Sequence, residues 1–190
     1  MDSTTSTEQG LLNLLITVGN AYPAIQLLLS TFFVLVGVYL VGSAIKGIYD
    51  LTAHGTFAHG GYHHKTHGGL LWRLFIGVVL TALTYSVGLL GNSIFGTEVS
   101  SGLMAYQTAG ASAAQQAAVT AVFEVFALCG FAATGHGWLT LNASKSGQNQ
   151  VGAKASVVWI LSGIGLIYLP QVLNAIAALT GLNVVNLLLF

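Results

Sequence analysis

Long apolar stretches alternate with short polar connections along this chain. Four stretches contain few or no charged side chains: 24–49, 70–96, 117–141 and the segment from Lys154 to the C-terminus. A helix that crosses a hydrocarbon core of about 30 Å needs about 20 mainly apolar residues, and each stretch meets this length. The pattern therefore predicts an all-α integral membrane protein with about four spans.

Two prolines indicate where the first span begins and where the last one breaks. Pro23 precedes the first stretch, and proline is favoured at the start of a helix, so we expect that span to begin at residue 24. The apolar run 11–18 is too short to cross a bilayer and predicts an interfacial segment within residues 1–23. No charged residue follows Lys154, so the last stretch is too long for one upright helix, and Pro170 predicts its break.

The four spans form two tandem helical hairpins, 24–96 and 117–190, within a single membrane domain that covers residues 1–190. Residues of the first hairpin recur ninety positions later in the second. The matching pairs are Phe33 and Phe123, Gly47 and Gly137, Leu51 and Leu141, and Ala53 and Ala143. Each set lies where a predicted span descends into a basic connection, which is the arrangement of a doubled hairpin.

The composition supports membrane embedding, because 54% of the residues are hydrophobic and only 5% are charged. Soluble domains carry charge on about a quarter of their residues. The formal net charge is zero, which argues against a free monomer that binds nucleic acid. The single cysteine, Cys129, excludes an internal disulfide framework, and its apolar sequence neighbours favour a small packing residue.

The basic residues gather around two connections. They are Lys46, Lys65 and Arg73 around the first, and Lys145 and Lys154 around the second. By the positive-inside rule both connections are cytoplasmic, so the N-terminus, the 97–116 loop and the C-terminus lie on the opposite side. We expect these side chains to face phospholipid head groups, or the lumen of an assembly.

A histidine-rich connection, HGTFAHGGYHHKTHGG at residues 54–69, holds five of the six histidines. His63 and His67 are four residues apart and would share a helical face, which would suit two ligands of a zinc site. However, HGG occurs at 59–61 and again at 67–69, and glycine disfavours a helix between them. We therefore expect no metal, but a solvated turn whose histidines meet lipid phosphates or nucleic acid.

The third span contains a carboxyl side chain, Glu124, and an imidazole side chain, His136. Charged groups inside a bilayer cost several kcal/mol, which makes any of them a functional candidate. Glu124 is a candidate for a proton relay or an ion path, and the alternative is a packing contact or a hydrogen bond to another subunit. His136 lies about 18 Å further along a helix, so the two side chains cannot pair within one chain.

Glycines recur in the spans and predict close helix packing, within one bundle or between copies, because small residues let helix backbones approach each other in lipid. The candidates are Gly37, Gly42, Gly47, Gly88, Gly91, Gly163 and Gly165. No phosphate-binding loop, nucleophile elbow, HExxH or Rossmann fingerprint occurs, and no Ser, His and Asp cluster can be assembled. We therefore expect no catalytic site and no enzymatic activity.

The second half of the chain contains a span that ends in Gly-x-Trp, a basic loop with glycine and glutamine, and a further span with a glycine-rich turn. The residues concerned are Phe131, Gly137, Trp138, Lys145, Gly147, Gln148, Lys154, Gly163 and Asn174, and GLLGNSIFG precedes them at 88–96. In this pattern the chain resembles the IcmC/DotE and TraQ proteins, although His136 stands where that family usually has an arginine. The resemblance covers roughly two thirds of the chain.

The resemblance implies a membrane subunit of a type IVB secretion or conjugal transfer apparatus in the bacterial inner membrane. Within it we favour a pilin-like role, in which many copies leave the membrane and form a surface filament with bound phospholipid and no other cofactor. The partners would be further copies, membrane lipid, other subunits of the apparatus and, in passing, single-stranded DNA or a substrate protein. The alternatives are a non-polymerising assembly factor and a small ion or proton channel.

Overall fold

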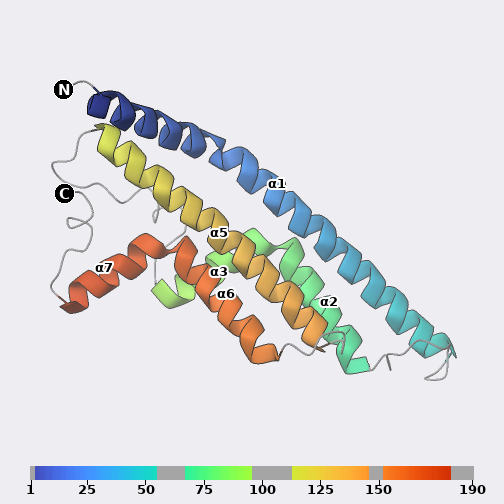
Figure 1. The fold of residues 1–190 in the computed structure, drawn as a ribbon. Coiled ribbons are helices and arrows are strands. Elements are labelled where there is room, and N and C mark those ends of the chain that lie inside the picture. Colours follow the sequence, from blue (N-terminus) through green and yellow to red (C-terminus); the bar gives the residue numbers. More distant parts are fainter. Residues whose placement is uncertain (1–2, 55–66, 96–112, 146–151, 181–190) are drawn as a thin grey trace. The chain divides into compact units, whose positions relative to one another are not determined.

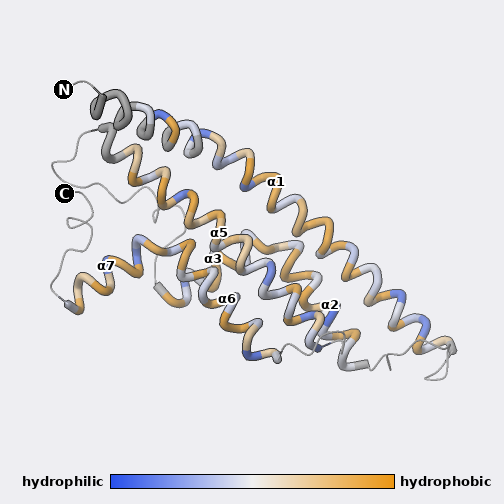
Figure 2. The backbone as a smooth tube through the Cα atoms, in the orientation of Figure 1, coloured by the Kyte–Doolittle hydropathy of each residue, from blue (hydrophilic) through white to orange (hydrophobic). Residues whose placement is uncertain are grey.

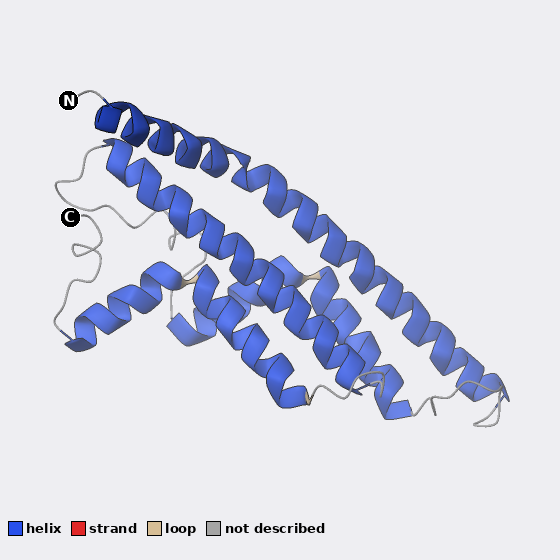
Figure 3. Cartoon of the chain, viewed as in Figure 1, coloured by secondary structure: helices blue, strands red, loops and turns tan. Residues whose placement is uncertain are grey.

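The computed structural model describes residues 3–54, 67–95, 113–145 and 152–180, and all regular structure within these ranges is helical (Figures 1 and 3). The helices are α1 Ser3–His54, α2 His67–Thr81, α3 Leu83–Phe95, α5 Ala113–Lys145, α6 Ala153–Ile167 and α7 Leu169–Thr180. The predicted all-α class is therefore confirmed for the described residues.

Two helices are long and apolar enough to cross a membrane alone, over Gly19–Ala53 of α1 and Ala117–Lys145 of α5. Two further candidates are bent pairs, Gly68–Thr81 with Leu83–Ile94 and Ala153–Ile167 with Leu169–Thr180. Apolar residues run along all of these helices (Figure 2). The described chain thus contains two candidate spans, or up to four if each bent pair counts as one.

Pro23 lies inside α1, which runs without interruption from Ser3 to His54. The predicted helix start at residue 24 is therefore wrong, whereas the interfacial placement of residues 1–23 stays a prediction. Proline removes one backbone hydrogen bond and still occurs within membrane helices, because neighbouring groups can satisfy the carbonyl that it frees. The freed carbonyl here belongs to Gly19, four residues earlier.

The predicted span 70–96 is not one straight helix, since α2 and α3 meet at Ala82 with a bend of 88°. No proline lies nearby, so the sequence did not mark this break. The Thr81 hydroxyl donates to the carbonyl oxygen of Gly77 at 2.9 Å, and such back-bonding often bends helices. Backbone bonds from Ala82 to Val78 and from Ser86 to Ala82 continue on either side of the break.

The last stretch bends as predicted, by 83° between α6 and α7, at Tyr168. Pro170 is the second residue of α7. The first N–H groups of a helix have no partner within it, so a proline there costs no intrahelical hydrogen bond. The break therefore precedes the proline by two residues instead of coinciding with it.

The chain forms two compact units, and each contains parts of both predicted hairpins. Unit 1 comprises 1–27, 88–131 and 164–190, and unit 2 comprises 28–87 and 132–163. In unit 1, the buried ring of Tyr168 occupies the space beside Gly91 of α3.

In unit 2, α1 and α2 approach each other at glycines. A Cβ atom added to Gly37 would lie 2.6 Å from the backbone nitrogen of Thr81 and 2.7 Å from the carbonyl oxygen of Gly77. One added to Gly47 would lie 2.7 Å from Cδ2 of Leu70. Thr81 thus pairs with the earlier position on α1 and Leu70 with the later one, so the two helices run antiparallel.

The same kind of contact recurs between α5 and α6 in unit 2. A Cβ atom added to Gly137 would lie 2.7 Å from Cγ1 of Ile160, as one at Gly47 would from Leu70. Both members of this pair lie ninety residues after their counterparts. The offset of ninety residues therefore relates the contact of α1 with α2 to the contact of α5 with α6, and not only single residues.

Candidate functional site

A cluster of aromatic and basic side chains joins the first turns of α2 to the last turns of α5, within unit 2. The rings of Trp72 and Phe75 stack with centroids 5.3 Å apart, and Phe75 meets Trp138 edge-on at 6.3 Å. The Lys145 ammonium lies 5.9 Å from the centroid of Trp72, within the range of a cation–π interaction. We call these four residues the Trp72 cluster.

Two hydrogen-bond donors at or beside the Trp72 cluster are unsatisfied. Nε1 of Trp138 and Nε of Arg73, the residue after Trp72, are buried and have no hydrogen-bond partner in the described part of the chain. A buried unpaired donor costs about 1–3 kcal/mol. Lys145 is exposed and its ammonium lies over the Trp72 ring, so the described residues of this region offer cations and N–H donors without a matching anion.

The sequence did not predict this cluster, although it named two of the basic residues. The available signal was the adjacency of Trp72 to Arg73 and the position of Trp138 near the end of a span. Aromatic residues gather where membrane helices leave the hydrocarbon. The contact of Phe75 with both tryptophans depends on α2 and α5 being neighbours, which the sequence does not specify.

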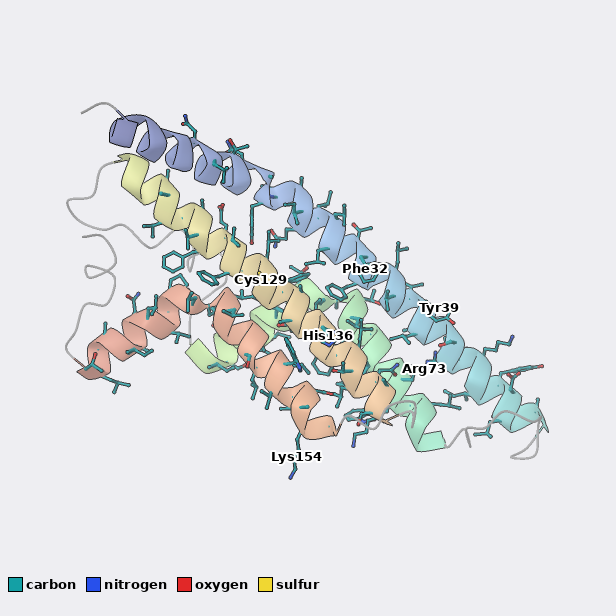
Figure 4. The ribbon with its side chains drawn as sticks, in the orientation of Figure 1. Phe32, Tyr39, Arg73, Cys129, His136 and Lys154 are labelled. Carbon is teal, nitrogen blue, oxygen red and sulfur yellow. The ribbon has the colours of Figure 1, made fainter. Side chains whose placement is uncertain are left out.

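The other predicted basic residues are not members of the Trp72 cluster. Lys46 on α1 and Lys154 in the first turn of α6 are exposed, and Lys154 projects away from its helix (Figure 4). Lys65 lies outside the described residues, as does most of the histidine-rich connection. The predicted His63 and His67 pair therefore has no structural description, and the described residues contain no group of three metal-ligating side chains.

Glu124 of α5 lies in unit 1, against the backbone of α1. A Cβ atom added to Gly19 would be 3.1 Å from Glu124 Oε2 and 3.2 Å from the Cβ of Ala121. Tyr22, three residues after Gly19, is close enough to interact electrostatically with the carboxyl group. Glu124 is half-buried within the single chain, so its nearest surroundings are intramolecular.

The remaining polar and sulfur-containing candidates face outward. His136 is exposed, and its ring meets that of Trp159 on α6 edge-on at 5.4 Å. Cys129 is also exposed, so it is not packed against other helices of the described chain, and its role as a small packing residue stays a prediction. Both residues are labelled in Figure 4.

The predicted packing glycines divide into two groups. Gly37, Gly47 and Gly91 have no room for a Cβ atom, and they lie against Thr81, Leu70 and Tyr168 respectively. Gly88 is half-buried and Gly163 is buried. Gly42 and Gly165 have no atom within 4 Å of an added Cβ, so they take no part in close packing within this chain. Gly19, Gly77 and Gly135 also make close contacts, although the sequence analysis did not select them.

Much of α1 is apolar, and other described parts of the chain leave it uncovered. Large side chains of unit 2 on this helix, among them Leu28, Leu35, Tyr39 and Tyr49, are between 65% and 71% exposed. Soluble monomers rarely expose large contiguous apolar patches. In a membrane protein, lipid or another protein surface covers such a helix face.

No protein-family model, no curated protein and no solved structure matches this chain.

Proposed function

We propose that this chain is a structural membrane subunit of a type IVB conjugation or secretion apparatus, a pilin-like protein that polymerises together with phospholipid. The assignment to that apparatus rests on the resemblance to the IcmC/DotE and TraQ proteins at Gly137, Trp138, Lys145 and Lys154. The observation that carries the pilin-like role is the uncovered apolar face of α1. It offers a helical surface that can be in lipid before assembly and against another copy afterwards.

The Trp72 cluster supports the phospholipid part of the proposal. Tryptophan rings at the end of a span sit at head-group depth, and a lysine beside them attracts an anionic phosphate. The unpaired donors of Arg73 and Trp138 could be satisfied by phosphate oxygens, since arginine and indole N–H groups both donate to them. Head groups held in this way would travel with the subunit into a filament.

Single-stranded DNA or a substrate protein would then be a transient partner of the assembly. Five basic residues per chain, partly covered by lipid phosphates, would leave a wall that neither repels nor traps nucleic-acid phosphates strongly. The subunit would be made in the bacterial inner membrane and extracted to the cell surface, in contact with the other subunits of the apparatus.

Crosslinking in surface filaments tests the proposal. We would replace Cys129 with serine and introduce one cysteine on the uncovered face of α1, Leu35→Cys. The matched control is Ala44→Cys on the same helix, because Ala44 is 0% exposed. Sheared surface material is viewed by negative-stain microscopy with antibody to the chain and treated with a short thiol crosslinker.

We expect labelled filaments, and dimers from the Leu35→Cys variant in far greater yield than from the Ala44→Cys variant. Filaments without the chain, or the chain confined to the inner membrane, would overturn the pilin-like role and favour a non-polymerising assembly factor. Labelled filaments with equal crosslinking of both variants would keep the pilin-like role and exclude the α1 face as the contact.

A further inference from the structure

The carbonyl group of Gly19 lacks its usual partner within α1. In an α-helix the carbonyl of one residue accepts from the N–H four residues later. For Gly19 that residue is Pro23, which has no N–H group. Gly19 lies at the start of the candidate span Gly19–Ala53, where a neighbouring helix can supply the donor that the proline withholds.

Glu124 is the polar side chain that lies at this position in unit 1. Its Oε2 atom is 3.1 Å from where a Cβ of Gly19 would stand, so the missing side chain of Gly19 is what lets the carboxyl group reach the backbone of α1. Ala121, one turn earlier on α5, contacts the same place through its Cβ and leaves room for this approach. The contact thus places a titratable oxygen beside Gly19, the residue whose carbonyl group lacks its usual N–H donor.

An ionised Glu124 would meet no lysine, arginine or histidine side chain among the described residues of unit 1. Every lysine, arginine and histidine of the sequence falls in unit 2. The titratable neighbour from α1 is Tyr22, and a phenol carries no positive charge. A carboxylate in an apolar span without a cation is costly, whereas a neutral carboxylic acid can donate one hydrogen bond.

We propose that Glu124 holds a proton and donates it in a hydrogen bond to the carbonyl oxygen of Gly19. The site binds one proton, with Glu124 as its carrier and the proline-freed carbonyl as the acceptor. Pro23, Gly19 and Glu124 then act together. The proline leaves the carbonyl without its donor, the glycine gives access to it, and the glutamic acid donates the hydrogen bond. This inference does not rest on the proposed function, and either can fail without the other.

A comparison of unfolding midpoints in detergent micelles tests whether the effect of Glu124 depends on Pro23. Glu124→Gln keeps a hydrogen-bond donor, whereas Glu124→Met keeps the length of the side chain and removes the donor. Pro23→Ala returns an N–H group to α1. The matched control is Pro170→Ala, because Pro170 lies in the first turn of α7, where no intrahelical bond is lost.

We expect Glu124→Gln to unfold close to the unsubstituted protein and Glu124→Met to unfold at a clearly lower temperature. In the Pro23→Ala background the Glu124→Met shift should fall to less than half, and in the Pro170→Ala background it should keep its full size. Equal shifts in all backgrounds, or a Glu124→Gln shift as large as that of Glu124→Met, would overturn the proposal.

Infrared difference spectra provide a readout that does not depend on the variants being equally stable. The spectrum of the folded protein at neutral pH minus that of Glu124→Gln should contain the carbonyl stretch of one protonated carboxylic acid. A difference that contains only carboxylate bands means that Glu124 is ionised, and it rejects the proposal even if the unfolding results agree with it.

Discussion

Replacing Gly37 with alanine tests whether backbone proximity sets the packing of α1 on α2. The added Cβ atom would lie 2.6 Å from the backbone nitrogen of Thr81 and 2.7 Å from the carbonyl oxygen of Gly77. Backbone atoms cannot rotate away as a side-chain end can, so the helices must separate. Such overpacking costs about 1–3 kcal/mol, and the higher helix propensity of alanine returns about 0.5–1 kcal/mol.

The expected net loss for Gly37→Ala is therefore about 0.5–2 kcal/mol. Gly42 on the same helix is the matched control, because an added Cβ there meets nothing within 4 Å. Gly42→Ala should stabilise the protein by about 0.5–1 kcal/mol. Gly47→Ala should fall between them, since its near neighbour is the methyl end of Leu70, which can change rotamer.

Unfolding of each variant in the same detergent, followed by helical circular dichroism against denaturant, gives the three values. For a domain of this size, 1 kcal/mol corresponds to roughly 2–4 °C in the melting temperature. The reasoning predicts the order Gly42→Ala, Gly47→Ala, Gly37→Ala from most to least stable. If Gly37→Ala were as stable as Gly42→Ala, the close approach of α1 and α2 would be refuted.

Two further predictions concern lipid and topology. Lys145→Glu should lower the amount of anionic phospholipid that co-purifies with the protein, because it replaces the cation of the Trp72 cluster, whereas Lys46→Glu should lower it much less. Mass spectrometry of the extracted lipid gives both amounts, and equal losses would show that the cluster does not bind lipid preferentially. In a Cys129→Ser background, a cysteine at Gln148 should react with an impermeant thiol reagent only after the inner membrane is opened, and one at Gly110 should react in intact spheroplasts. Labelling at Gln148 in sealed spheroplasts would contradict the cytoplasmic assignment.

The sequence predicted the helices well because membrane insertion leaves a strong local signal. Twenty or more apolar residues in succession have few alternatives to a helix in lipid. The bend near Pro170 was also predictable, because proline ends helices through its own covalent geometry. These predictions need no knowledge of which helices are neighbours.

The errors arose where a second helix decides the outcome. Pro23 marks a helix start in water, yet here α1 continues through it, beside a carboxyl group supplied by α5. The bend at Ala82 has no proline, and Gly77, whose carbonyl accepts from Thr81, also lies against α1, since a Cβ added to it would be 2.9 Å from the backbone nitrogen of Val41. Gly42 and Gly165 look identical to Gly37 in sequence, but only contact with another helix distinguishes a packing glycine.

The candidate site was predictable in part for the same reason. Lys145 and Arg73 were named because charge is rare in this chain and each basic residue stands out. The two tryptophans of the cluster, Trp72 and Trp138, belong to different helices, and nothing local in the sequence connects them. The placement of Glu124 against Gly19 likewise depends on which face of α5 meets α1.

The directions of three helices in unit 2 limit how the chain can thread a bilayer. α2 runs back along α1, from Leu70 beside Gly47 to Thr81 beside Gly37. α5 passes Phe33 of α1 at Gly135, and its last carbonyl, that of Lys145, lies near Gly69 of α2. Gly69 precedes Leu70, which lies beside the later position Gly47 of α1, so α5 runs in the same direction as α1.

Two helices that point the same way cannot be consecutive crossings. If α1 and α5 both cross the bilayer, the chain between them must return through it an odd number of times. Within the described chain, the apolar segment available for that return is α2 with α3, despite the bend of 88°. The start of α5 then lies on the same side of the membrane as the start of α1, whichever side that is.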